Sequence, residues 1–278
     1  MPTLNQRIAD FYDTSTQLWL DVWGEHMHHG YYTDQSKSHA QAQIDLIERL
    51  LDFGGVSRAD QILDIGCGVG GSARYLARKY DAQVLGVTLS PVQAARAADY
   101  NKAAGLEHRV HIKVQDMMTV EAEATYDLIW SMESAEHIAD KPELLANIYR
   151  WLKPGGRFVM ATWCTRDTPP ALTGSEQRLL QRIYDLYHLP PMVSVDSLQR
   201  MAHRAGLEQV TTDEWSQAVA PFWKAVIQSA LKWSSVRGLL KAGWPTIKGA
   251  WAMRYMTKGF KQGVLKFGVM SGRKPLDS

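Results

Sequence analysis

The chain has 278 residues, 45% of them hydrophobic, and a formal net charge of +2 at pH 7, enough to form one large core or one core with an appended lobe. It contains no run of about eighteen apolar residues and no apolar leader segment, so neither a membrane span nor a signal peptide is expected. Its two cysteines, Cys67 and Cys164, exclude a disulfide framework and indicate a reducing, cytoplasmic-type compartment.

The first segment, residues 1–35, is predicted to be an aromatic lid over a ligand. Its aromatic and histidine side chains are Trp19, Trp23, His26, His28, His29, Tyr31 and Tyr32. Gly24 and Gly30 interrupt the segment, so no long helix is expected there. No carboxylate and cysteine set completes a metal site with the three histidines, and no metal is predicted.

A glycine-rich turn follows the first predicted strand. Residues 36–53 have helical apolar spacing and lead to the short apolar strand 61–65, after which glycines occupy positions 66, 68, 70 and 71. Such a turn lets backbone N–H groups approach a ligand, and the helix that follows directs its positive end there. The G-x-G-x-x-G spacing alone is a weak signal that dinucleotide-binding enzymes share, and a tight turn without a ligand is the alternative.

Two residues disfavour NAD as that ligand. Asp64 precedes the first glycine, where its carboxylate would repel a pyrophosphate but could meet a cationic amino group. Thr88 stands about twenty residues on, where a dinucleotide site needs an acid for the ribose. We therefore expect a different nucleotide-like cofactor.

Strands and helices then alternate along the chain. Strands are predicted at 83–88, 109–114, 126–130 and 157–162, with helices at 72–80, 91–104 and 141–152 between them. This order predicts an α/β fold with a doubly wound, mostly parallel sheet whose ligand lies at the carboxyl ends of the strands. Those ends carry Asp64, Thr88, Asp116 and Ser131.

The last third of the chain is predicted to complete the sheet and cover it. Helices are expected at 175–187 and 195–205, and strands at 208–215 and 263–270, which gives seven strands in all. The expected organisation is a lid (1–35), a cofactor-binding core (36–215), a helical substrate-cover insertion (216–262), and a final strand with its tail (263–278).

Charge is unevenly distributed. Residues 221–278 contain eleven Lys and Arg against one acid, Asp277, with Trp223, Trp233, Trp244 and Trp251 among them. This pattern suits the surface of an anionic membrane, or a solvated helical face over a core. Residues 1–220 are net acidic and would repel phosphate, so no nucleic-acid partner is expected.

Three ordered motifs resemble class I S-adenosylmethionine-dependent methyltransferases. They are Asp64-Ile65-Gly66-Cys67-Gly68-Val69-Gly70-Gly71, Gly86-Val87-Thr88-Leu89-Ser90 with Gln93, and Leu152-Lys153-Pro154-Gly155-Gly156. Further stretches resemble the gamma-tocopherol C-methyltransferase family, namely Trp23 to Tyr32, Trp130 to His137, Thr162-Trp163-Cys164 and Val219 to Trp223. The resemblance implies a Rossmann-like fold, S-adenosylmethionine as cofactor, and methylation of the chromanol ring of gamma-tocopherol, with delta-tocopherol as a second acceptor, in vitamin E biosynthesis. Close relatives of that family methylate alkaloid nitrogens, so an amine N-methyltransferase is the main alternative.

The resemblance also implies which residues bind the cofactor. Gly66, Cys67 and Gly68 belong to the loop at its methionine part, and Asp64 acts through the amino group or by holding the loop. The remaining cofactor-binding residues are Thr88, Leu89 and Gln93 at the ribose and adenine edge, Asp116 and Met117 at the adenine amino group, and Ser131 at a strand end. Tyr12, Trp19 or Trp23 could close over the sulfonium.

Ring methylation requires a base, because a phenol ring carbon is a poor nucleophile until the hydroxyl is deprotonated. His137 is the first candidate, since an unperturbed histidine pKa near 6.5 suits reversible proton transfer. Glu133 and Glu136 are the other two candidates for the base, and Glu133 or Glu136 could instead orient His137. The alternative for all three is that they only open or cap a helix. His26, His28 and His29 are further candidates.

The lipophilic acceptor fits a peripheral membrane enzyme. A tocopherol carries a long apolar tail that lies in the bilayer, and the basic aromatic segment after Pro221 would let the enzyme rest on that surface. The expected location is the cytoplasm of a cyanobacterial-type cell, or a plastid if a transit peptide has been removed. Two other classes stay open: a lipid-binding protein with a vestigial cofactor site, and a nicotinamide oxidoreductase, which Thr88 disfavours.

Overall fold

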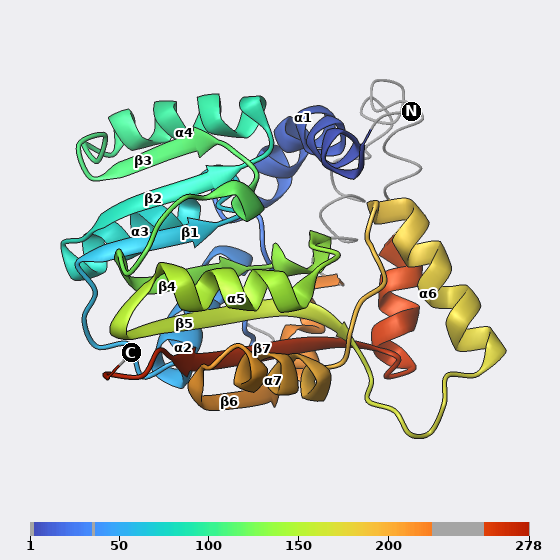
Figure 1. The fold of residues 1–278 in the computed structure, drawn as a ribbon. Helices are drawn as coiled ribbons and strands as arrows, with labels where there is room; N and C mark the ends of the chain where they lie inside the picture. The colour runs from blue at the N-terminus through green and yellow to red at the C-terminus, as the bar shows by residue number, and fades with distance from the viewer. Residues whose placement is uncertain (1–2, 35–36, 224–252, 278) are drawn as a thin grey trace, which may run out of the picture.

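The computed structural model describes residues 3–34, 37–223 and 253–277. Seven strands form one sheet in the order β3-β2-β1-β4-β5-β7-β6 (Figure 1). They are β1 (Gln61–Ile65), β2 (Gln83–Thr88), β3 (Val110–Val114), β4 (Tyr126–Met132), β5 (Leu152–Thr165), β6 (Glu208–Glu214) and β7 (Leu265–Arg273). Only β7 runs antiparallel to its neighbours, so the doubly wound, mostly parallel sheet expected from the sequence is confirmed.

Helices cover both faces of this sheet (Figure 1). They are α1 (Leu4–Trp23), α2 (His39–Phe53), α3 (Gly71–Tyr80), α4 (Pro91–Ala103), α5 (Lys141–Trp151), α6 (Gly174–Tyr187), α7 (Val195–Arg204), α8 (Ser216–Val219), the 3-10 turns η1 (Met117–Thr119) and η2 (Ala135–His137), and a helix at 253–261. Successive strand residues point to opposite faces, so Trp130 packs with α2 and α3 whereas Ile129 packs with α5 and α7. Both side chains are fully buried, which divides the core into two layers.

The N-terminal segment is the largest departure from the expected fold. In place of an interrupted segment, residues Leu4–Trp23 form one helix of 20 residues. Thr3 and Gln6 cap its start reciprocally, and Gly24, with φ of 76°, ends it. The glycines that suggested a break lie after the helix, so the expectation of irregular chain holds only for residues 24–34.

A third apolar cluster lies at the carboxyl end of β5. Leu179 and Ile183 of α6 pack there with Met256 of the helix at 253–261 and with Phe222 and Trp223. Of the range 216–262, where the sequence predicts a substrate cover, residues 216–223 and 253–262 are described, whereas Trp233, Trp244 and Trp251 lie outside the described residues. Within the described chain, no helix combines the length and apolarity needed to cross a bilayer.

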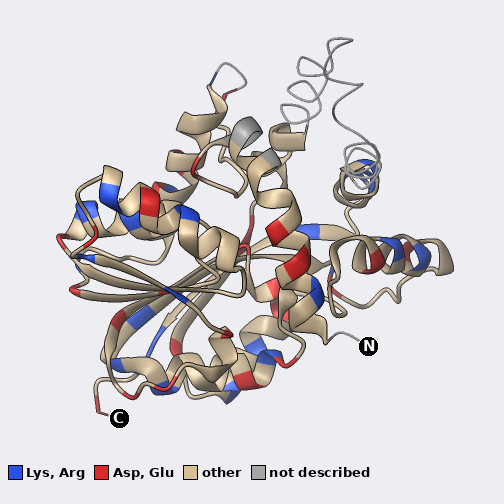
Figure 2. Cartoon of the chain, turned by 90° about the horizontal axis from the view of Figure 1, so that it is seen from above, with Lys and Arg blue, Asp and Glu red and all other residues tan. Residues whose placement is uncertain are grey.

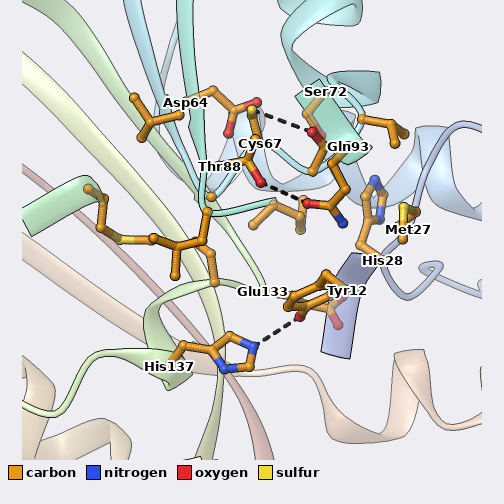
Figure 3. Close-up of a pocket in the computed structure, with 18 of the residues that line it drawn as sticks. Tyr12, Met27, His28, Asp64, Cys67, Ser72, Thr88, Gln93, Glu133 and His137 are labelled. Atoms are coloured by element: carbon orange, nitrogen blue, oxygen red, sulfur yellow. Dashed lines mark hydrogen bonds between the residues drawn. The ribbon is translucent and has the colours of Figure 1, made fainter. Parts of the chain in front are cut away.

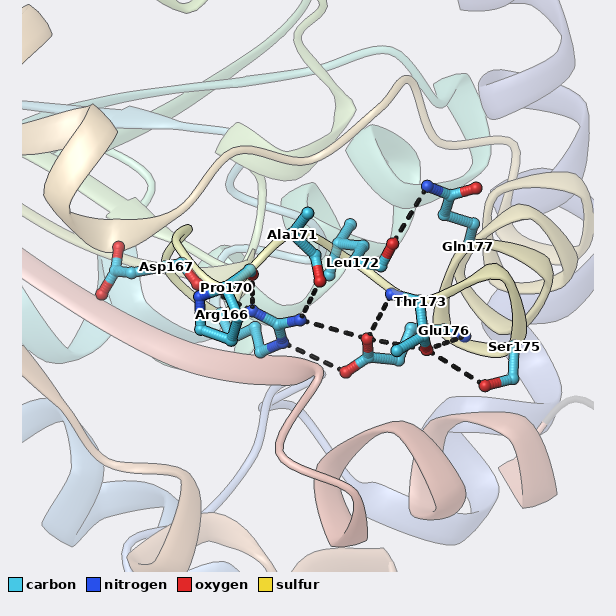
Figure 4. A network of polar contacts seen from close by, with 9 residues as sticks. All are labelled: Arg166, Asp167, Pro170, Ala171, Leu172, Thr173, Ser175, Glu176 and Gln177. Atoms are coloured by element: carbon cyan, nitrogen blue, oxygen red, sulfur yellow. Dashed lines mark hydrogen bonds and ion pairs between the residues drawn. The ribbon is translucent and has the colours of Figure 1, made fainter.

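A polar network fixes the connection between β5 and α6 (Figure 4). The Arg166 guanidinium donates from Nε and from one terminal nitrogen to the Glu176 carboxylate, both at 3.1 Å, and to the Ala171 carbonyl at 3.0 Å. Glu176 also caps α6 reciprocally with Thr173. The loop is therefore tied to the first turn of the helix that it precedes.

Candidate active site

The candidate site lies at the carboxyl ends of β1, β2 and β4, where the strand order reverses direction. A pocket opens there, with about 930 Å³ of free space when the solvent at its mouth is included. The loops after β1 to β4 and the N-terminal residues line this pocket (Figure 3). Of the predicted cofactor residues, it brings together Asp64, Gly66, Cys67, Gly68, Thr88, Leu89, Gln93, Asp116 and Met117.

The glycine loop forms the floor of the pocket. The N–H groups of Gly66 and Cys67 both donate to the Val87 carbonyl, at 3.0 and 2.9 Å, which fastens the loop to β2. Gly66 has φ of 79°, and a Cβ there would lie 2.2 Å from the Ser134 Cβ. Only glycine therefore fits at this position.

Asp64 stands beside this loop with an unsatisfied carboxylate oxygen. The residue is 1% exposed, and its Oδ2 has no hydrogen-bond partner among the described residues. Burial raises the pKa of Asp64 to about 7, because no positive charge offsets the loss of water. Nearby, a Cβ at Gly68 would meet only Gln93 Nε2, at 4.0 Å, so the loop surface faces open pocket. A buried carboxylate oxygen without a hydrogen-bond partner, beside backbone that faces the open pocket, fits the cationic amino-acid end of S-adenosylmethionine.

The end of β2 offers neutral polar groups in place of an acid. Thr88 Oγ1 donates to Gln93 Oε1 at 2.8 Å, and Ser90 Oγ accepts from the Gln93 N–H at 3.0 Å as the cap of α4. Ser90 also bonds the Asp13 carboxylate of α1. A hydroxyl and an amide thus stand where ribose hydroxyls would need partners.

Asp116 already has two partners at the end of β3. One carboxylate oxygen accepts the Met118 N–H at 2.9 Å as the cap of η1, and the other accepts Asn5 Nδ2 of α1 at 2.6 Å. Met117 is 8% exposed and lies against the glycine loop, since its methyl would stand 3.4 Å from a Cβ at Gly66. An adenine amino group would share Asp116 with Asn5.

His137 pairs with a tyrosine of the N-terminal helix. Tyr12 Oη and His137 Nε2 are 3.0 Å apart, and both residues line the pocket (Figure 3). Burial lowers the pKa of His137 to about 4, well below the ordinary value assumed from the sequence, so the imidazole is neutral at neutral pH. Trp19 packs edge-on against Tyr12 but does not line the pocket, and the side chain of Trp23 lies outside the described residues.

The two glutamates that could orient His137 do not bond it. Glu133 lines the pocket, but its carboxylate accepts the backbone N–H of His29 and lies 2.7 Å from His29 Nδ1. Glu136 faces away and accepts Thr162 Oγ1 at 2.8 Å, and burial raises its pKa to about 8. Among the described residues Tyr12 is the hydrogen-bond partner of His137, so neither glutamate orients it, and their candidacy as the base stays a prediction.

Ser131, the last predicted cofactor residue, does not line the pocket. Its hydroxyl lies 3.0 Å from Ser134 Oγ, which in turn donates to the Ile65 carbonyl at 2.6 Å. Ser131 thus supports the wall from behind.

Several residues that line the pocket or support its wall had no sequence signal. Asn5 and Asp13 belong to α1 and look like ordinary surface residues in the sequence. Arg74 is 2% exposed beneath the glycine loop, where it bonds Glu25 at 2.7 Å and the Val69 carbonyl at 2.7 Å. The contacts of Asn5 and Asp13, and that of Arg74 with Glu25, join distant parts of the chain, which a local pattern does not report.

The strand order of the sheet, the glycine loop and the buried carboxylate of Asp64 define a class I S-adenosylmethionine-dependent methyltransferase. Residues 3–228 match the model of the mycolic acid cyclopropane synthetase family, and the chain belongs to that family. S-Adenosylmethionine is accordingly its cofactor.

Curated relatives cover almost the whole chain. It is 42% identical to a probable chloroplastic tocopherol O-methyltransferase of Oryza sativa subsp. japonica, over 99% of this chain and 79% of the relative. It is 41% identical to the chloroplastic tocopherol O-methyltransferase of Arabidopsis thaliana, over 98% of this chain and 83% of that protein. Norajmaline N-methyltransferase of Rauvolfia serpentina is 31% identical over 99% of both chains.

A solved structure shares the fold. The crystal structure of a putative sarcosine dimethylglycine methyltransferase from Galdieria sulphuraria superposes with a TM-score of 0.83 at 26% identity, over 95% of this chain and 99% of that one.

Proposed function

We propose that this enzyme transfers a methyl group from S-adenosylmethionine to the ring carbon beside the hydroxyl of gamma-tocopherol, with delta-tocopherol as a second acceptor. The two plant relatives carry tocopherol in their names, which supports a phenolic acceptor with a long apolar tail. The observation that carries the chemistry is the Tyr12 and His137 pair, because it sets a proton acceptor beside the cofactor loop.

Different residues of the pocket would bind different parts of the cofactor. Asp64 would bind its amino group, Thr88 and Gln93 its ribose, and Asp116 its adenine. The cofactor supplies a methyl group on a sulfonium, which leaves its bonding electrons on sulfur as the methyl departs. The protein must therefore position and activate the acceptor.

Tyr12 and His137 can take up the acceptor's hydroxyl proton. As a phenol proton moves to Tyr12 Oη, the tyrosine's own proton moves to His137 Nε2, which is free to accept because the imidazole is neutral. The acceptor becomes a phenolate, and its ortho carbon gains the electron density needed to attack the methyl group.

The apolar tail would approach from the side of α6 and the helix at 253–261. Arg178 and Arg182 of α6 and Arg254, Lys258 and Lys261 of the second helix are exposed. Figure 2 marks the Lys and Arg positions of the described chain in blue and the Asp and Glu positions in red. Basic side chains over an apolar cluster support peripheral contact with an anionic membrane. Chloroplastic relatives support a plastid as the location, and a cyanobacterial-type cytoplasm is the alternative.

The experiment that tests this proposal supplies labelled S-adenosylmethionine with gamma-tocopherol in detergent micelles and locates the new methyl by mass spectrometry and NMR. A ring-carbon product supports it. A methyl on the phenol oxygen, the acceptor that the plant relatives' names specify, would contradict the ring-carbon assignment.

An amine acceptor is the second candidate, because an N-methyltransferase is 31% identical over almost the whole chain. An indole-type amine assayed in parallel distinguishes the two. If only the amine is methylated, the assignment of the cofactor site stands and the acceptor is a nitrogen in place of a ring carbon.

A further inference from the structure

A second buried pair, His29 and Glu133, takes no part in the chemistry above. Both oxygens of the Glu133 carboxylate are bound by one residue: Oε1 accepts the His29 backbone N–H and Oε2 faces His29 Nδ1, each at 2.7 Å. The side chains are 1% and 8% exposed, so water competes little for these bonds. His29 thus binds both oxygens of a carboxylate that lines the pocket.

The backbone and the surrounding rings hold this geometry. Glu133 has φ of 51°, a left-handed conformation that costs energy in a non-glycine residue, and its N–H donates to the Ala161 carbonyl at 2.7 Å. The His29 ring lies between Phe222 and Phe267, with centroid distances of 4.1 and 5.3 Å. Neither partner of the pair can turn away without disrupting packed groups.

This arrangement keeps Glu133 ionised. Burial alone would raise the pKa of the carboxyl, but the charge and hydrogen bonds of His29 outweigh it and hold the pKa below its ordinary value. The other titratable groups around Glu133 are His28 of the N-terminal segment, Tyr12 of α1 and Glu136 of its own loop. The result is a buried carboxylate at the pocket, and its charge adds to burial and to Glu136 in raising the pKa of the Tyr12 phenol.

Methylation at a ring carbon requires two proton transfers, and the Tyr12 and His137 pair accounts only for the one at oxygen. Once the methyl is joined, the same carbon still bears its hydrogen, and the ring is a dienone that has lost its aromaticity. A second base is needed at carbon.

We propose that Glu133 takes up this ring hydrogen as a proton and that His29 is the positioning residue that keeps the carboxylate ionised and fixed at the pocket. The step rests on the proposed function. The C–H bond breaks, its electron pair restores the aromatic ring, the ring oxygen recovers its proton from Tyr12, and Glu133 becomes a carboxylic acid. One proton is released overall, as replacement of an aryl hydrogen by a cationic methyl donor requires.

The test uses gamma-tocopherol carrying deuterium on the accepting ring carbon, with His29→Phe as the main variant. Phenylalanine keeps the ring packing and the backbone N–H of residue 29, and it removes the Nδ1 donor together with the charge of the imidazole. In the wild type we expect no isotope effect on kcat, because proton loss is fast. In His29→Phe we expect kcat to fall by about tenfold or more, a primary isotope effect to appear, and the acidic limb of the pH profile to move to higher pH.

Two further variants and a control sharpen this test. Glu133→Gln should lower kcat on the order of 100-fold with the same isotope effect. His29→Asn sets an amide N–H near the position of Nδ1 and should restore the acidic limb toward that of the wild type. His39→Asn is the matched control, since His39 also lies against Phe222, at 5.3 Å, but its partner is Tyr32.

A readout that needs no turnover is the titration of Glu133 by ¹³C NMR in glutamate-labelled protein, with the signal assigned by Glu133→Gln. The midpoint of the Glu133 titration should rise in His29→Phe and return toward the wild-type value in His29→Asn. If the wild type makes the ring-carbon product but His29→Phe shows no isotope effect, no shifted limb and no shifted titration, this step is overturned alone. If the wild type makes no ring-carbon product, the proposed function fails and the step fails with it.

Discussion

Replacing Asp64 by asparagine should stabilise the cofactor-free protein while weakening cofactor binding. Burial raises the pKa of Asp64 from 3.8 to about 7, a difference of roughly three pKa units that corresponds to about 4 kcal/mol. Because the folded-state pKa lies above the unfolded one, the unfolded chain releases the Asp64 proton first as pH rises. The contribution of Asp64 to the free energy of unfolding is therefore fully present below about pH 4 and declines as pH rises to about 7. Above about pH 7 the loss is constant.

Asparagine does not titrate, so the variant escapes this loss. The free energy of unfolding of Asp64→Asn should exceed that of the wild type by up to about 4 kcal/mol at about pH 8 and by little at about pH 4. Urea denaturation at several pH values measures the difference. S-Adenosylmethionine should narrow this difference without reversing it, since saturation at about 100 times Kd stabilises the wild type by about 2.7 kcal/mol and the variant lacks the carboxylate for the amino group.

Asp127 supplies a control of opposite sign. It accepts the Gln61 N–H and Lys153 Nζ, both at 2.8 Å, and although burial opposes them these bonds lower the pKa of its carboxyl. That stability is present above the unfolded pKa and is lost as pH falls, so Asp127→Asn should destabilise the protein at neutral pH. Parallel pH dependence in the wild type and Asp64→Asn would refute the assignment of a raised pKa to Asp64.

Further predictions concern the loop, the acid-base pair and the N-terminal helix. Tyr12→Phe should lower kcat on the order of 100-fold while calorimetry shows unchanged cofactor affinity; a weakened affinity would instead assign Tyr12 to the cofactor. Gly66→Ala should cost about 1–3 kcal/mol in urea denaturation, because its Cβ would lie 2.2 Å from that of Ser134. Gly105→Ala, with φ of 66° and no atom within 4 Å, should cost only about 1 kcal/mol, so equal losses would contradict the steric account. Asp13→Ala should expose α1 to proteolysis, because it removes the bonds of that carboxylate to the start of α4; unchanged cleavage would contradict this.

The sequence predicted the central fold because local signals there agreed. Apolar runs bounded by glycines and helical spacing located all seven strands, and a strand ending at Asp64 before a glycine turn located the cofactor loop. The sequence failed where the deciding contact is remote in the chain. The buried environment that lowers the His137 pKa to about 4 and the His29 partner of Glu133 are both invisible to spacing. The sequence analysis also missed α1, because its residues, which include no glycine or proline, were interpreted together with the glycines that follow them.

That missed helix links parts of the site that the sequence treated as separate. Asn5 reaches Asp116 after β3, Asp13 reaches Ser90 after β2, and Tyr12 reaches His137 after β4. Each contact reaches a different loop. The contacts to Asp116 and Ser90 lie at the predicted cofactor site, and the contact to His137 forms the proposed acid-base pair. A displacement of α1 would therefore disturb cofactor contacts and separate Tyr12 from His137 together, so one packed element makes proton transfer depend on the arrangement that holds the cofactor.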